Sequence, residues 1–385
     1  MAVLPFYISN KKNLKIVIVG GGYAGIAALT TIARYQPSAE ITLIDPKIDH
    51  IKITHLHETF RYPLTDFLIP FTNIEQEFGC RHLPLELPFS ESTLLQWERD
   101  KTISINNESI PFDYLLIASG ALNNNADQDS GDVMGLNAFM KHPGSEILSQ
   151  FLSKPGTEAP ISVIGGGATG IQFLFEIEHF LRYHKYKNKL RLIDSGDQVL
   201  KQFPDRFARY VEAAMKNLNI EYYPTTYFRG QQHSQIRLED KKTSHQFELP
   251  SSLTFLFSGK SQGSVLKANA FGQVIVDQQI LQHIFVAGDC AYYQSIGSNA
   301  LTAQSAVRKG KLAARNLLRH SGLLKILEPY LHRDIGYVVS LGPADAIGWL
   351  ALENNVVTGL AAYTIKEIVE AQYDLLLAGI DTYLL

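Results

Sequence analysis

Residues Lys15–Gly25 read KIVIVGGGYAG and decide the fold, because a run of apolar, mostly β-branched residues leads directly into a glycine motif. The glycines stand at the first, third and sixth positions of the motif, at Gly20, Gly22 and Gly25. In a strand–loop–helix unit of this kind, the first glycine makes a tight turn and the second lets the backbone approach a pyrophosphate. The third packs the helix against the strand, and the phosphates lie at the helix N-terminus, where unpaired N–H groups favour an anion.

The same pattern occurs a second time further along the chain. Residues Ile161–Gly170 read ISVIGGGATG, with glycines at Gly165, Gly167 and Gly170. Each unit continues into a second apolar run that ends in an acid, Asp45 in the first unit and Asp194 in the second. These acids follow the last glycine of their motif by 20 and 24 residues, near the spacing at which a carboxylate accepts ribose hydroxyls. One motif alone could be a glycine-rich turn of an ordinary α/β protein, whereas two complete units predict two dinucleotide sites.

The composition is that of a globular protein without strong charge. Of 385 residues, 45% are hydrophobic and 19% are charged, and the net charge of −3 gives no general attraction to nucleic acid. The one basic stretch, residues 182–191, is interpreted as the exposed end of a helix. Met1–Leu14 lacks the pattern of a secretory signal, and no apolar run is long enough to span a membrane. We therefore expect a protein of the cytoplasm that does not bind nucleic acid.

The two cysteines, Cys80 and Cys290, lie far apart in the sequence. They make no disulfide scaffold, and a reducing compartment suits them. Because no C-x-x-C or similar close pair occurs, we do not expect a redox disulfide that relays electrons, and we interpret Cys290 as a buried, inert thiol.

We predict an α/β fold with two Rossmann-like dinucleotide-binding domains, the first interrupted by the second. The first domain is expected at residues 1–155 and 272–322, and the second at residues 156–271. A C-terminal region, residues 323–385, is expected to pack on the core, on a dimer partner or on a membrane. Its apolar positions fall close to one helical face: Ile365, Ile368, Val369, Leu375, Leu376, Ile380, Tyr383 and Leu384. The polar face is mainly acidic, whereas helices that lie on membranes favour lysine and arginine.

Four segments carry a resemblance to a known family: the first glycine motif, YLLIASG at 114–120, the second glycine motif, and IFVAGD at 284–289. Over residues 14–320 the chain is similar to the pyridine nucleotide-dependent flavoproteins that bind two dinucleotides, with Ser119 in place of that family's usual threonine. The resemblance implies that the first unit binds FAD through Gly20, Gly22, Gly25, Asp45, Ser119, Gly120, Gly288 and Asp289. It implies that the second unit binds NAD(P)H through Gly165, Gly167, Gly170 and Asp194.

Within this superfamily the chain most resembles the type II NADH:quinone oxidoreductases, and the lack of a cysteine pair fits them. Residues 301–310 resemble the helix of their quinone site, whose pattern is Ala-Gln-x-Ala-x-Gln. Gln304 matches the first glutamine, and Arg308 stands where the second is expected. Positions four residues apart share a helical face, so these two are our candidates for the electron-acceptor side. Alternatively, Gln304 only satisfies backbone groups near the helix start.

Two further departures from the family pattern affect the site. Gln172 stands where type II enzymes usually carry a glutamate near the nicotinamide, and Glu176, one turn later, either substitutes for it or is a surface acid. His50, His55 and His57 invite a metal site, but His55 and His57 would point to opposite sides of an extended strand. Without an obvious acidic third ligand we predict no metal, and expect this loop to line the entry of the flavin or the acceptor.

The coenzyme preference is predicted to be NADH over NADPH. Asp194 would accept ribose hydroxyls and repel a 2′-phosphate, and no arginine follows it directly. Lys185, Lys187 and Lys189 are the counter-argument, because a loop could fold one of them back.

Three functions remain open at this point. The first is an FAD-dependent NADH dehydrogenase that passes electrons to a quinone, either free in the cytoplasm or peripheral on the membrane, and either monomeric or a homodimer. The second is a reductase of a small iron–sulfur protein or a soluble acceptor. The third is a flavin- and NAD-binding partner protein without catalysis. The redox step itself belongs to the flavin, so we name no catalytic acid or base.

Overall fold

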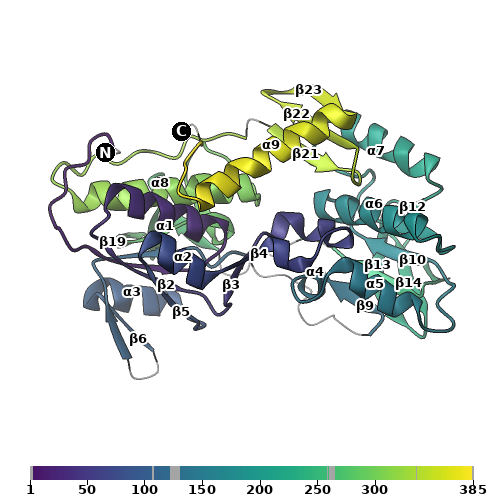
Figure 1. The fold of residues 1–385 in the computed structure, drawn as a ribbon, viewed down its shortest axis with the longest axis horizontal. Helices are drawn as coiled ribbons and strands as arrows, with labels where there is room; N and C mark the ends of the chain where they lie inside the picture. Colours follow the sequence, from purple (N-terminus) through teal and green to yellow (C-terminus); the bar gives the residue numbers. More distant parts are fainter. Residues whose placement is uncertain are drawn as a thin grey trace.

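The computed structural model of the chain describes residues 3–105, 108–121, 131–257, 259, 265–334 and 336–383. Within these ranges the strands form two large sheets, one for each glycine motif, with smaller antiparallel sheets around them (Figure 1). The predicted α/β class with two Rossmann-like units is confirmed.

The first sheet has eight strands in the order β20-β17-β18-β19-β8-β1-β2-β5. At its centre, β1 (Lys15–Val19) is parallel to β2 (Glu40–Ile44) and β8 (Tyr114–Ile117), and β8 is parallel to β19 (Gln279–Val286). The other strands are β5 (Arg81–Leu83), β17 (Leu266–Ala268), β18 (Gln273–Val276) and β20 (Ala291–Tyr293). Helices cover both faces, which explains the nearly continuous apolar sequence of β1. Helices α1 (Tyr23–Tyr35) and α8 (Ala303–Ser321) pack on one face, and α3 (Glu91–Asp100) packs on the other.

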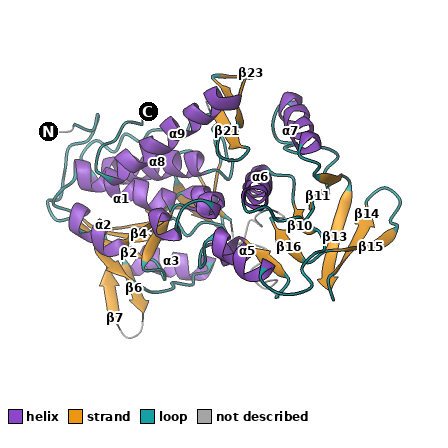
Figure 2. Cartoon of the chain, turned by 45° about the vertical axis from the view of Figure 1, so that its right-hand side comes forward, coloured by secondary structure: helices purple, strands orange, loops and turns teal. Residues whose placement is uncertain are grey.

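The second sheet has five parallel strands in the order β12-β11-β10-β16-β9. They are β9 (Val133–Gly135), β10 (Ile161–Ile164), β11 (Leu190–Ile193), β12 (Glu221–Tyr223) and β16 (Leu253–Leu256). Its helices are α4 (Leu136–Phe139), α5 (Gly144–Leu152), α6 (Ala168–Tyr183) and α7 (Asp205–Asn217). Beside it stands an antiparallel sheet of β13 (Thr226–Gln232), β14 (Gln235–Asp240) and β15 (Gln246–Pro250) (Figure 2).

Two strands lie across the predicted domain boundaries. β9 precedes residue 156 yet forms an edge of the second sheet, and β17 precedes residue 272 yet belongs to the first sheet. These strands mark where the chain enters and leaves the second unit. The division into residues 1–155 with 272–322, 156–271 and 323–385 otherwise stays a prediction.

The segment between β2 and β5 reaches from the first unit to the second. It contains β3 (Asp49–Ile51), the 3₁₀ helices η1 (Ile53–Phe60) and η2 (Leu64–Phe67), β4 (Leu68–Pro70) and α2 (Phe71–Phe78). The prediction of an extended strand at His55 and His57 was wrong, because residues 53–60 form the 3₁₀ helix η1. The remaining short elements are β6 (Thr102–Ile105), β7 (Glu108–Pro111) and η3 (Gly288–Cys290).

The C-terminal region forms an antiparallel sheet of β21 (Gly336–Ser340), β22 (Ala346–Leu350) and β23 (Leu352–Thr358), followed by α9 (Gly359–Leu377). α9 runs from this sheet back to α1 and α8, where Tyr373 and Leu376 pack on Ala27 and Val307 (Figures 1 and 2).

Several of the apolar positions predicted for this region lie on the exposed side of α9 and not against the core. α9 buries the charged Lys366 together with Ala362, Tyr373 and Leu376, and it exposes Leu360, Ile368, Val369 and Leu375. Leu384 lies outside the described residues. Within the described ranges, every helix is too short or too polar to cross a bilayer.

Candidate functional site: two dinucleotide loops and a buried polar cluster

The first glycine loop joins β1 to α1 at the carboxyl end of the first sheet. Gly20 has a φ of +102°, which favours glycine, and a Cβ there would lie 2.2 Å from the Ala118 carbonyl oxygen. A Cβ on Gly25 would lie 1.8 Å from the Gly20 carbonyl oxygen, so this glycine lets α1 pack on the loop. Gly22 differs, because a Cβ there would have no described protein atom within 4 Å. The backbone is therefore open at the one glycine that a pyrophosphate has to approach.

Asp45 follows β2 and holds this loop. Its Oδ2 accepts the Gly21 N–H at 2.7 Å, and its Oδ1 accepts the Lys47 N–H at 2.9 Å. A carboxylate offers about four acceptor positions, so Asp45 keeps capacity for ribose hydroxyls.

The remaining FAD-side candidates lie beside the first glycine loop. Ser119 and Gly120 follow β8, while Gly288 and Asp289 follow β19, and these strands are parallel neighbours of β1 whose carboxyl ends meet at one edge. Gly288, at a φ of +77°, approaches α1 so closely that a Cβ would lie 2.9 Å from the Ala24 Cβ. All eight residues assigned to FAD by resemblance thus gather at one end of the sheet.

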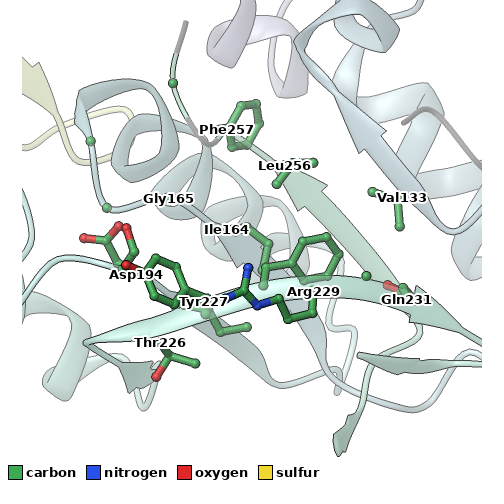
Figure 3. A pocket seen from close by; sticks show the side chains of 17 residues that line it. Val133, Ile164, Gly165, Asp194, Thr226, Tyr227, Arg229, Gln231, Leu256 and Phe257 are labelled. Carbon is green, nitrogen blue, oxygen red and sulfur yellow. The ribbon is translucent and has the colours of Figure 1, made fainter. Parts of the chain in front are cut away.

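The second glycine loop repeats this geometry at the carboxyl end of the second sheet. Gly165 has a φ of +110°, and a Cβ on Gly170 would lie 2.0 Å from the Gly165 carbonyl oxygen. Gly167 is open, with no described atom within 4 Å of a Cβ. Gly165, Gly167 and Asp194 line a pocket of about 700 Å³ (Figure 3). Gly170 lies outside its lining and packs the helix on the loop.

Sequence reasoning missed the far wall of this pocket, which β13 supplies through Tyr227, Arg229 and Gln231. The Arg229 guanidinium lies 4.8 Å from the centre of the Tyr227 ring, and its Nε donates to Glu239 Oε2 at 2.9 Å. Asp194, Tyr227 and Arg229 follow one another along the pocket (Figure 3). All six residues from Thr226 to Gln231 line the pocket, and a β-bulge between Phe228 and Gly230 interrupts the alternation of the strand, so no simple alternating pattern marks this wall. The sequence does not tell which strand crosses the pocket.

The three lysines considered as partners for the 2′-phosphate of NADPH lie at the opposite end of β11 from Asp194. Lys185, Lys187 and Lys189 are exposed ahead of the amino end of β11, whereas Asp194 follows its carboxyl end. A cation that does lie beside Asp194 is Lys241, whose Nζ donates to the carbonyl oxygen of the next residue, Ser195, at 3.3 Å.

Both acceptor-side candidates lie on α8, near its N-terminus. Thr302 caps this helix by accepting the Ser305 N–H at 3.1 Å, so the capping role considered for Gln304 belongs to Thr302. Arg308 lies 5.3 Å from the centre of the Tyr383 ring, in the C-terminal tail. Burial lowers the pKa of Arg308, while Tyr383 and Asp381 oppose the shift. The C-terminal tail therefore contacts one of the two candidates, which the sequence did not indicate.

The neighbouring Lys309 is 1% exposed and lies against the loop that carries Asp289. Its Nζ donates to the Ala291 carbonyl oxygen at 2.9 Å, and burial lowers the pKa of Lys309 to about 8. Sequence reasoning missed this buried cation, since lysine is usually exposed.

A buried polar cluster surrounds η1 and explains the unusual histidine segment. Glu176, weighed as a surface acid, is instead 0% exposed and accepts Arg61 Nε at 2.9 Å and Nη2 at 3.0 Å. Burial raises the pKa of Glu176, and Arg61 opposes that shift; the fork geometry identifies an ion pair. Gln172 is not free either, because its Nε2 donates to Ser340 Oγ at 3.2 Å.

The same cluster contains a set of potential metal ligands that the sequence did not assemble. Ligand atoms of His55, Glu58 and Glu370 lie within 4.8 Å of one another. Lys366 Nζ donates to Glu58 Oε1 and to Glu370 Oε2, each at 2.6 Å. The two carboxylates share the Lys366 ammonium, which compensates for one of their two negative charges, so they have a buried cationic partner without a metal ion.

The cysteines contribute no redox pair. Cys80 and Cys290 are both free thiols. Burial raises the pKa of Cys80 to about 11 and also raises that of Cys290, so neither is a thiolate near neutral pH. The prediction that Cys290 is buried is confirmed.

Two sheets with parallel central strands, each with a glycine loop open at its second glycine, define an oxidoreductase of the type that holds two dinucleotides. The sequence model of the pyridine nucleotide-disulphide oxidoreductases matches residues 14–310, so the chain belongs to this family and is an FAD-dependent NAD(P)H oxidoreductase.

Known proteins match nearly the whole chain. It is 23% identical to a type II NADH:quinone oxidoreductase of Staphylococcus aureus, over 95% of this chain and 96% of that protein. Among solved structures it is similar to NDH2 of Plasmodium falciparum in complex with NADH (TM-score 0.73, 17% identity, 94% of each chain). It is equally similar in fold to the sulfide:quinone oxidoreductase of Aquifex aeolicus (TM-score 0.73, 16% identity), over 95% of this chain and 92% of that one.

Proposed function

We propose that the chain is an NADH dehydrogenase that holds FAD at the first glycine loop and NADH at the second, and passes electrons to a quinone-type acceptor. The observation that carries this proposal is the shared geometry of the two loops. In each, the first glycine has a φ above +100° and the third packs against the carbonyl oxygen of the first, while the second faces open space. The names of the relatives support the choice of NADH and a quinone.

The residues of the chain would bind and orient the two dinucleotides. No described side chain caps the N-terminus of α1 or of α6, so their first N–H groups can donate to phosphate oxygens. Asp45 and Asp194 would accept ribose hydroxyls, and the charge of Asp194 disfavours the 2′-phosphate of NADPH. FAD held at the first glycine loop would supply the redox chemistry, as an acceptor of hydride and a donor of electrons.

On the acceptor side, Gln304 would donate to a quinone oxygen, and Arg308 would stabilise negative charge that develops there. Arg308 also favours a second candidate, a reductase of a small iron–sulfur protein or another soluble acceptor. A charged residue stands where the quinone enzymes carry a neutral amide, and the contact with Tyr383 fixes it in place. An acidic partner protein would be complementary to this cation.

We further propose a cytoplasmic location, with contact to a membrane surface or a second copy of the chain through the exposed side of α9. Leu360, Ile368, Val369 and Leu375 give this side an apolar character. Glu367 and Asp374 lie on the same helix and disfavour an anionic membrane surface.

The test is anaerobic reduction of the purified flavoprotein by NADH, followed by rapid mixing with a soluble quinone or with a reducible iron–sulfur protein. Fast reoxidation by the quinone supports the first function. Turnover only with the protein acceptor would select the second. Flavin reduction no faster than that of free FAD would refute both and leave a binding protein without catalysis.

A further inference from the structure

Residues 50–61, named here the bridging segment, connect the first glycine loop to α6, the helix that begins at the second glycine loop. By sequence this segment belongs to the first unit, since it lies between β2 and β5 of the first sheet. By packing it also belongs to the second, because Leu56 and Phe60 lie in the same core as Phe173 of α6. The Phe60 ring comes so close to the start of α5 that a Cβ on Gly144 would lie 2.7 Å from it.

One end of the bridging segment is tied to the first glycine loop. His50 is 1% exposed, and burial lowers its pKa to about 4, so its ring is neutral. Its Nδ1 lies 2.8 Å from the Gly21 carbonyl oxygen, which can only accept, so Nδ1 carries the proton. Nε2 then accepts the Tyr373 hydroxyl of α9 at 3.0 Å. A second tie joins the hydroxyls of Tyr23 and Thr54 at 2.7 Å.

The other end is tied to the helix that begins at the second glycine loop. Arg61 directly follows η1, and its guanidinium makes the bidentate ion pair with Glu176 of α6. Glu176 lies nine residues beyond Gly167, which is about 13 Å along a helix that rises 1.5 Å per residue. A rotation of α6 at Glu176 is therefore transmitted to the glycine loop.

A neutral hydrogen-bonded chain supports the first turns of the same helix. His57 Nε2 lies 3.0 Å from Ser340 Oγ, and Gln172 Nε2 donates to that oxygen at 3.2 Å. Burial lowers the pKa of His57 to about 3, so this ring is neutral, and its Nε2 and the Ser340 hydroxyl share one hydrogen bond. The bridging segment thus contacts α6 near both its start and its middle.

We propose that Arg61 and Glu176 are positioning residues, an inference that rests on the function proposed above. Their ion pair locks α6 to the bridging segment and so sets how the second glycine loop, with NADH, faces the first, with FAD. Buried ion pairs are weak sources of stability, because desolvation offsets the attraction, but they can select one arrangement of the groups around them. Neither residue lines the NADH pocket, so their effect has to pass through α6.

The test compares R61M/E176M with wild type. The double substitution removes both charges, which avoids the unpaired buried charge that a single substitution leaves. R182M/E178M is the matched control, since Arg182 Nε and Glu178 Oε1 form an ion pair at 3.0 Å on the same helix, with Arg182 mostly exposed.

Stopped-flow reduction by NADH gives the limiting rate and the dissociation constant separately. In R61M/E176M we expect a limiting rate lower by about 100-fold, as a misplacement of about 1 Å can produce. FAD content, the dissociation constant of NADH and Tm stay unchanged, and the long-wavelength absorbance band of the stacked nicotinamide and flavin weakens. Hydrogen exchange without coenzyme should be faster at residues 53–60 and 168–176. The control variant should match wild type in every measurement.

A wild-type rate and absorbance band in R61M/E176M would overturn the positioning role. So would a rate that falls only in proportion to FAD content or Tm, because that is the result of a merely structural pair. If wild type itself is not reduced by NADH, the proposed function fails, and unchanged hydrogen exchange would still show separately that the pair does not lock α6.

Discussion

Replacing Gly22 with valine is expected to abolish FAD binding while leaving the protein folded. Gly22 has a φ of −77° and a ψ of −170°, which any residue adopts, and a Cβ there would have no described atom within 4 Å. Substitution of Gly20 or Gly25 would not test FAD binding alone, because a Cβ at either position would collide with a backbone carbonyl oxygen and disturb the fold. Valine is also a poorer residue than glycine at the start of a helix, at a cost of about 1 kcal/mol or less to the free energy of unfolding.

The cost to FAD binding is much larger. The valine methyl groups would occupy the space where the pyrophosphate has to meet the first N–H groups of α1. Hydrogen bonds to a charged group contribute about 1.5–3 kcal/mol each, so the loss of two removes about 3–6 kcal/mol. Because 1.4 kcal/mol is tenfold in an equilibrium constant, the Kd of FAD should rise by about 10² to 10⁴.

Gly167→Val is the matched variant, because Gly167 begins α6 with a φ of −74° and is equally open. Gly22→Val should be purified colourless, with the same circular dichroism spectrum as the apoprotein. Gly167→Val should be yellow, with full FAD content, but should require far more NADH for flavin reduction. FAD content is measured by absorbance after denaturation, and Kd by fluorescence titration of apoprotein.

Stoichiometric flavin in Gly22→Val would refute the assignment of the first loop to FAD. Loss of FAD in Gly167→Val, with retention in Gly22→Val, would show that the two coenzymes occupy the opposite loops. Loss of folding in Gly22→Val would contradict the open geometry on which the argument depends.

Three further outcomes follow from the site. Asp194→Ser should lower the ratio of kcat/KM for NADH to that for NADPH by about 10- to 100-fold, since about 1.5–3 kcal/mol of hydrogen bonding to the ribose is lost; a higher kcat/KM for NADPH in the unaltered protein would refute the NADH preference. Arg308→Gln restores the amide of the quinone enzymes, so flavin reduction by NADH in stopped flow should be unchanged while reoxidation by quinone changes; equal effects on both half-reactions, or none, would show that this face of α8 is not the acceptor site. Acidification should destabilise the protein through buried neutral histidines. In the unfolded chain a histidine binds its proton near pH 6.5, whereas His50 does so only near pH 4. The free energy of unfolding therefore falls by about 1.4 kcal/mol per pH unit below 6.5 for this residue. Urea unfolding of His50→Gln at several pH values should show a slope smaller by that amount, and an unchanged slope would contradict it.

The glycine loops were predictable because their requirements are local. Gly20 and Gly25 are needed for contacts within a few residues or with the adjacent strand, and the strand runs before them fix the α/β order. The acids after β2 and β11 follow at a spacing that the unit itself sets. The wall of the pocket at the second glycine loop was not predictable in the same way. Tyr227 and Arg229 reach the loop only through the three-dimensional course of β13, which no spacing in the sequence specifies.

The residues that sequence reasoning misplaced share a distant partner. Glu176 looked like a surface acid because its partner Arg61 lies 115 residues away, and α9 buries Lys366 against Glu58, 308 residues away. A charged side chain is buried only where a partner compensates for lost solvation, so a pattern that counts neighbours along the chain assigns it to the surface. Both pairs hold the bridging segment, one to α6 and the other to α9. These charges are buried at a cost in desolvation and lie outside the pocket at the second glycine loop, so the arrangement that they select explains them best. Removing Arg61 and Glu176 together should therefore change the rate of flavin reduction by NADH more than it changes stability.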